Sequence, residues 1–170
     1  MLYFIKNGLL ERSRETEDME KDERYMQEVA NGYRPDVERL IKYIPWLETK
    51  AGTNTASSIY TGEGIGEHSI TFPVYDSTLL SLVKDAKQTG LLDRNYAYVY
   101  SRNRIRTVAE EQDYIERATI RQMDGLKGIL SKYILGGLTK GTVWTEGVTN
   151  GSILKVLTKM KEILEYWEKR

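Results

Sequence analysis

Apolar residues recur at three- and four-residue intervals along most of the chain, a spacing typical of helices that bury one face. The clearest stripe follows Gly151 and keeps helical spacing for about four turns. Its members are Ile153, Val156, Leu157, Met160, Ile163, Leu164 and Trp167. The same pattern predicts helices starting at Asp76 or Ser77, from about 107 to 117, and from Ile120 to a break at Gly136. These segments predict a mainly helical chain.

The N-terminal region has a different pattern. Residues 11–29 are rich in Glu, Lys, Arg, Met and Gln, which favour helix, but contain few apolar side chains. Asn31 and Gly32 give a helix-ending signal, and Pro35 suits the first turn of a new helix. We therefore expect residues 1–31 to form a charged helical arm and residues 32–170 to form a helical domain.

A segment rich in Thr, Ser, Gly and Asn interrupts the helical pattern between residues 49 and 66. Two short β-favouring runs, around Ile59 and Phe72, flank closely spaced glycines at 62, 64 and 66. This arrangement predicts a small β-hairpin with a glycine-rich tip. The expected fold class is mainly α, a single compact helical domain with a small β-hairpin and an exposed N-terminal helical arm.

Composition narrows the classes of function. The chain has no cysteine and one histidine, which excludes disulfides, thiolate catalysis and cysteine-ligated metal sites. The basic and acidic residues number 25 each, so no overall field attracts nucleic acid or an anionic membrane. No run of 18 apolar residues is present, which predicts a cytoplasmic protein that does not enter membranes. We expect no metal and no cofactor.

The C-terminal half, from about Phe72 onward, contains a recognisable pattern. Trp144 precedes Glu146 and Gly147, and a final amphipathic helix follows from Gly151 to Met160. These residues resemble the closing turn and last helix of the bacterial family known as domain of unknown function 6508. The resemblance implies a compact, mostly helical bacterial domain, and it implies no catalytic residues.

Three other groups of residues have both a functional and a structural interpretation. His68 lies beside a Gly/Ser segment, where a histidine is usually a surface residue. The spacing of Gly62, Gly64 and Gly66 matches neither the phosphate-binding loop nor the dinucleotide fingerprint, which favours a hairpin tip.

Carboxylates between residues 110 and 116 fit either a hard-metal site or a solvated helix face with nearby arginines. The solvated face is the favoured interpretation. The carboxylates are Glu110, Glu111, Asp113 and Glu116.

The segment from Arg94 to Arg106 is the candidate binding site, because it contains four arginines and no acidic residue. Its members of interest are Arg94, Tyr96, Tyr98, Tyr100, Arg102, Arg104 and Arg106. An extended backbone would place the tyrosines on one face beside the arginines, an arrangement that suits base stacking and phosphate pairing. A helical backbone would instead turn two tyrosines inward and spread the arginines over the surface. The net charge of zero favours the helical alternative.

The sequence predicts no enzyme, because no nucleophile with a base and no metal-binding constellation is recognisable. We expect a non-enzymatic binding or regulatory protein of a bacterium or phage, whose ligand is a nucleotide or a single-stranded nucleic acid held by the Tyr/Arg segment. The alternative is a protein–protein interaction module or inhibitor, for example in phage anti-defence, that acts through helical surfaces. Such a module would bind a protein partner or form a homo-oligomer.

Overall fold

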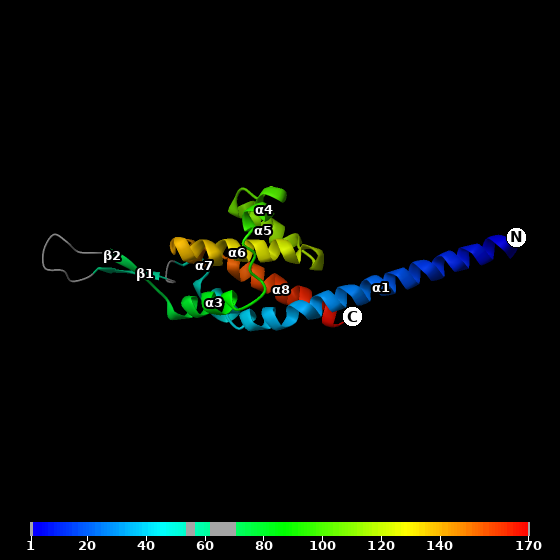
Figure 1. Cartoon of the computed structure of the whole chain (residues 1–170), viewed down its shortest axis with the longest axis horizontal. Coiled ribbons are helices and arrows are strands. Elements are labelled where there is room, and N and C mark those ends of the chain that lie inside the picture. The colour runs from blue at the N-terminus through cyan, green and yellow to red at the C-terminus, as the bar shows by residue number, and fades with distance from the viewer. Residues whose placement is uncertain (1, 54–56, 62–70, 170) are drawn as a thin grey trace.

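The computed structural model describes the backbone of residues 2–53, 57–61 and 71–169, and the side chains of residues 13–53 and 75–169. Helices dominate the described chain (Figure 1). They are α1 (Leu2–Ile41), α2 (Ile44–Lys50), α3 (Ser77–Lys87), α4 (Tyr96–Arg102), α5 (Val108–Arg117), α6 (Met123–Thr139), α7 (Thr142–Thr149) and α8 (Ser152–Glu168), with a short 3-10 helix, η1 (Ile120–Gln122), before α6. Within the described residues, no helix is both long and apolar enough to cross a membrane.

Helix α8 lies at the centre of the domain and contacts α1, α2, α5, α6 and α7. Its predicted stripe is confirmed, because the first six of its apolar residues are buried and Trp167 packs against the core. Helix α6 supplies a second buried face that includes Leu126, Leu130 and Tyr133. The removal of this apolar surface from water is the main source of stability for such a bundle.

Helix α1 runs without interruption through Gly32 and Pro35, so the predicted helix end at Asn31 is wrong. Ala30, Val37 and Leu40 are fully buried, whereas Gly32 and Pro35 lie on the exposed side. Tertiary packing of the buried face therefore outweighs the local break signals, as it commonly does in helices. The outer part of α1 extends beyond the other helices (Figure 1). The division at residue 31 is thus not marked by a break in the backbone.

Two other helix boundaries also differ from the sequence-based expectation. Helix α6 continues through Gly136 and Gly137 to Thr139, because the ring of Trp144 packs closely against Gly137 and fills the space of a side chain. The region around Glu146, expected to be a turn, belongs to α7. The predicted starts of α3 and α5 are confirmed by their caps, in which Asp76 accepts from the amide of Thr78 and Thr107 accepts from the amide of Glu110.

The predicted fold class needs a correction at the β-hairpin. We expected a single compact helical domain with a small β-hairpin, but among the described side chains every buried one comes from a helix or a connecting turn. Two extended segments, β1 (Ser57–Thr61) and β2 (Thr71–Tyr75), pair only with each other and project away from the helices (Figure 1). Tyr75, at the end of β2, is the strand residue whose side chain is described, and it packs edge-on against Trp144 of α7 with ring centroids 5.4 Å apart. The expected tip at Gly62, Gly64 and Gly66 lies outside the described residues.

Candidate functional site

The Tyr/Arg segment is helical over α4, so the extended arrangement that would align its three tyrosines on one face is absent. Tyr96 and Tyr100 are half-buried and Tyr98 is 65% exposed. The Tyr96 hydroxyl lies near Gly136 of α6, and the Tyr100 hydroxyl donates a hydrogen bond to Glu111 of α5. Tyr98 is the tyrosine of α4 that remains accessible to a ligand.

The four arginines of the segment, Arg94, Arg102, Arg104 and Arg106, are exposed. Within the residues that the structure describes, none of them forms an ion pair with a carboxylate. One helical turn separates Tyr98 from Arg102, which places these two side chains on the same face. The structure therefore brings one tyrosine and one arginine together, and it leaves Arg94 before the start of α4 and Arg104 and Arg106 after its end.

That turn ends α4 with a left-handed residue. Arg104 has a φ of 55°. The amide of Ile105 donates to the carbonyl of Tyr100 over 3.0 Å, and the amide of Arg104 donates to the carbonyl of Ser101 over 3.3 Å. This is the hydrogen-bond pattern of a Schellman cap, in which glycine usually occupies the left-handed position. The apolar Ile105 is buried just beyond it. The cap therefore holds an arginine in a backbone conformation that costs it energy.

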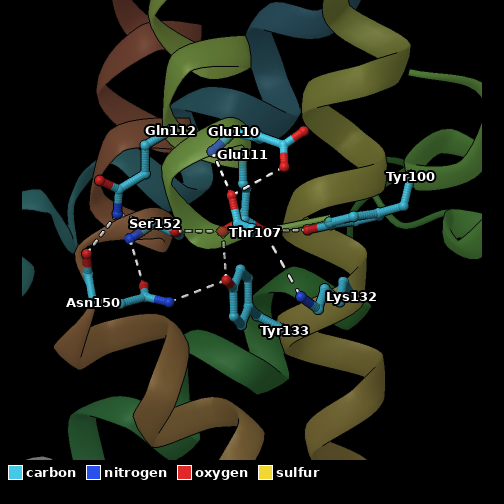
Figure 2. A network of polar contacts seen from close by, with 9 residues as sticks. All are labelled: Tyr100, Thr107, Glu110, Glu111, Gln112, Lys132, Tyr133, Asn150 and Ser152. Atoms are coloured by element: carbon cyan, nitrogen blue, oxygen red, sulfur yellow. Dashed lines mark hydrogen bonds and ion pairs between the residues drawn. The ribbon is translucent and has the colours of Figure 1, made fainter. Parts of the chain in front are cut away.

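A buried polar network joins α4 to the rest of the domain (Figure 2). Its centre is Glu111, which is 1% exposed. The Glu111 Oε2 atom accepts from the Tyr133 hydroxyl over 2.6 Å and from the Ser152 hydroxyl over 2.7 Å, while Oε1 accepts from Tyr100. The Lys132 Nζ atom lies 4.0 Å from Oε1, at the rim of the network. Three hydroxyl donors and one cation thus compensate the buried carboxylate.

Asn150 extends the network to the start of α8. Its Nδ2 donates to the Tyr133 hydroxyl over 3.1 Å, and its Oδ1 accepts from the amide of Ser152 over 2.8 Å (Figure 2). Gln112 Nε2 donates to the carbonyl of Asn150 over 2.7 Å. Among the described side chains, no buried polar atom lacks a hydrogen-bond partner. The network is therefore complete without a ligand.

Burial and the adjacent carboxylate affect the two tyrosines of the network. Burial, followed by the charge of Glu111 and the hydrogen bond to it, raises the pKa of Tyr100 well above its ordinary value. Burial and the bond to Glu111 likewise raise the pKa of Tyr133. Both hydroxyls therefore stay protonated and act as donors. This arrangement fixes α4, α5, α6 and α8 relative to one another and engages both carboxylate oxygens of Glu111.

Sequence reasoning placed Glu111 in a solvated acidic cluster, and for this residue the interpretation is wrong. Glu110, Asp113 and Glu116 are exposed, as expected of a solvated face, and Asp113 pairs with Arg117 over 2.8 Å. The described residues contain no group of carboxylates or histidines arranged to hold a metal ion. A signal was available, because Glu111 and the apolar Ile115 are one turn apart and therefore share a helix face. His68 lies outside the described residues.

A groove beside α1 was not predicted. It has a volume of about 540 Å³ and lies between the middle of α1, the segment around Ile120 and the end of α8. Met19 and Met26 line the α1 side, and Ile163, Tyr166 and Trp167 line the α8 side. Met19 is 65% exposed and Tyr166 is 50% exposed, which is unusual for large apolar side chains that line one groove. Asp22, Glu23 and Lys159 are among its charged residues.

The chain matches no protein-family model, and neither a curated protein nor a solved structure is significantly similar to it. The resemblance to domain of unknown function 6508 therefore stays a prediction.

Proposed function

We propose that this protein is a non-enzymatic binding protein that recognises another protein through α1 and the groove beside it. The observation that carries the proposal is the exposed Met19, which lies on a helix extending beyond its own domain and lines an apolar groove. Grooves of this kind bind the apolar face of a partner helix or surface. A cytoplasmic location, where such a partner would be met, belongs to the same proposal.

The charge of α1 defines the chemistry of the partner. Residues 13–25 are all exposed and contain six carboxylates but three basic side chains, a net charge of −3. We use the name acidic arm for residues 13–25. A partner that presents apolar side chains flanked by lysine or arginine is complementary both to the groove and to the acidic arm.

Binding of two synthetic amphipathic helical peptides tests this proposal. One peptide is built of leucine and lysine and the other of leucine and glutamate, and fluorescence anisotropy reports the affinity of each. We expect the lysine peptide to bind at least about tenfold more tightly. The variant Met19→Lys should weaken that binding at least about tenfold, because it places a charge in the groove.

Leu80→Lys is the matched control, because Leu80 is also a large exposed apolar residue, 45% exposed, but lies on α3 away from the groove. It should leave the affinity within about twofold of the wild type. Equal affinity of the two peptides, or equal effects of the two variants, would remove the support for a groove that prefers a basic partner.

A second candidate function is supported by the exposed arginines that follow Tyr98. Tyr98 and Arg102 share a face of α4 and could bind the base and the phosphate of a nucleotide or a short single strand. Titration calorimetry against nucleotides and short oligonucleotides tests this. Replacing Arg102 and Arg104 together by alanine should weaken binding at least about tenfold, and replacing the exposed Lys84 and Lys87 should not.

A further inference from the structure

The acidic arm has an electrostatic counterpart in the same chain. We use the name arginine patch for Arg94, Arg102, Arg104 and Arg106, which are exposed and have no ion-pair partner in the described part of the chain. No acidic residue lies among them in the sequence. The patch thus carries four positive charges, against a net charge of −3 on the arm, in a chain whose total net charge is zero.

Both the acidic arm and the surface beside the arginine patch expose large apolar side chains. The acidic arm contains Met19 and Tyr25, which are 65% and 61% exposed, and Tyr98, which is 65% exposed, lies one helical turn from Arg102 of the arginine patch. Charged groups that surround exposed aromatic side chains are typical of protein interfaces, where the aromatic residues supply affinity and the charges supply specificity. Each surface therefore combines exposed apolar side chains with charges opposite in sign to those of the other.

The arm cannot reach the patch of its own chain. Helix α1 is continuous, and its inner half packs against α8, buries Ala30 and Val37 in the core and pairs Arg34 with Glu168 at 3.6 Å. The outer half points away from α4 (Figure 1). A contact between the two surfaces therefore requires two chains.

We infer that the partner of the acidic arm is a second copy of this chain, whose arginine patch binds it. The inference rests on the proposed binding role of α1 and names the partner. Two copies can make this contact twice, each arm on the other copy's patch, and the closed two-fold pair is the commonest assembly of soluble homo-oligomers. Surface charges attract only over about 8–10 Å at physiological salt, so the pair forms more tightly as salt is lowered.

Charge reversal on both sides provides the test, with sedimentation equilibrium as the measurement. At about 50 mM salt, where screening is reduced, the wild type should sediment with about twice the chain mass of 19.7 kDa. The arm variant Glu17→Lys/Asp18→Lys and the patch variant Arg102→Glu/Arg104→Glu should each dissociate at least about tenfold more readily. An equimolar mixture of the two variants should recover the dimer, because one contact of the mixed pair keeps the original charges and in the other the introduced lysines face the introduced glutamates.

The control variant Lys84→Glu/Lys87→Glu changes the charge by the same amount as the patch variant but on the exposed face of α3, and it should dimerise like the wild type. Circular dichroism verifies that every variant remains folded. A wild type that stays monomeric at low salt overturns the inference, whether or not it binds an oligonucleotide through Arg102 and Arg104. A dimer that tolerates both reversals, or a mixture that stays monomeric, also overturns it. A monomer that still binds the lysine peptide would leave the proposed function standing and remove only this partner.

Discussion

The Tyr133 hydroxyl donates a hydrogen bond of 2.6 Å to the Oε2 atom of Glu111, and this bond connects two helices inside the core. Both side chains are almost inaccessible to water. A carboxylate in such a position is tolerated only because donors surround it. The same feature makes the network sensitive to any change that leaves one member unpaired.

We predict that Glu111→Ala lowers the free energy of unfolding by about 3–5 kcal/mol, because it leaves several hydroxyl donors unsatisfied. The substitution leaves the hydroxyls of Tyr133 and Ser152 without their acceptor and opens a cavity. Urea unfolding of the purified variant measures the loss. Glu116→Ala, on the exposed face of the same helix, should cost less than about 0.5 kcal/mol. Equal losses would show that the network contributes nothing particular to stability.

Stability should also fall at alkaline pH. Burial and the bond to Glu111 hold the pKa of Tyr133 above the usual value of 10, so above pH 10 this hydroxyl ionises in the unfolded chain before it ionises in the folded one. The unfolded state then binds fewer protons, and the free energy of unfolding decreases as pH rises. The contribution of Tyr133 is fully present below pH 10 and is lost above it.

Tyr133→Phe removes one titrating hydroxyl from the protein. The decline of the free energy of unfolding with pH should therefore become shallower by up to about 1.4 kcal/mol per pH unit above pH 10. Tyr43 adds to the decline in both proteins, because burial and its bond to Asp85 raise its pKa to about 12. Urea unfolding at a series of alkaline pH values gives the two slopes. Identical slopes would contradict the assignment to Tyr133.

The apolar stripe of α8 gives a simpler prediction. Leu157 is fully buried, so Leu157→Ala should lower the free energy of unfolding by about 2–5 kcal/mol, from lost burial and a cavity. Lys161→Ala on the exposed face of the same helix is the control. A loss below about 1 kcal/mol in denaturant unfolding would mean that the stripe is available to a partner instead.

Helices with a regular apolar stripe were predictable, because the spacing of Val156 and Met160 identifies the buried face without knowledge of what covers it. The continuity of α1 was not predictable. The break signals at Gly32 and Pro35 are local in the sequence, whereas the packing that overrides them comes from distant parts of the chain. Glu111 was misplaced for the same reason. Its partners Tyr133 and Ser152 lie 22 and 41 residues away in sequence.

The candidate site was predictable only in part. The exposure of the arginines between Arg94 and Arg106 follows from their charge, and the helical alternative for the segment is the one that the structure adopts. The burial of Tyr100 depends on its bond to Glu111, which no local pattern indicates. The groove beside Met19 forms between α1 and two segments that lie about a hundred or more residues further along the chain, so only the fold reveals it.

Two glycines within helices should respond to alanine in opposite directions. No atom beyond the local helix lies within 4 Å of a Cβ added at Gly32, so Gly32→Ala should stabilise the protein by about 0.5–1 kcal/mol through helix propensity. A Cβ added at Gly137 would lie 1.9 Å from the ring of Trp144, whose indole donates to the Ile134 carbonyl over 2.8 Å. Gly137→Ala should therefore cost about 1–3 kcal/mol. Thermal unfolding compares the two, and a destabilised Gly32→Ala would indicate that α1 ends at this glycine after all.

The left-handed conformation of Arg104 separates the role of its backbone from that of its charge. At a φ of 55° an arginine is strained where glycine is not, so Arg104→Gly should raise the free energy of unfolding by about 0.5–1 kcal/mol. Arg104→Ala removes the same charge but keeps a Cβ, and it should give no such gain. Urea unfolding of the two variants measures the difference. If both variants changed stability equally, the effect would come from the charge. A gain confined to glycine would mean that an arginine occupies a position better suited to glycine, as expected of a side chain used in binding.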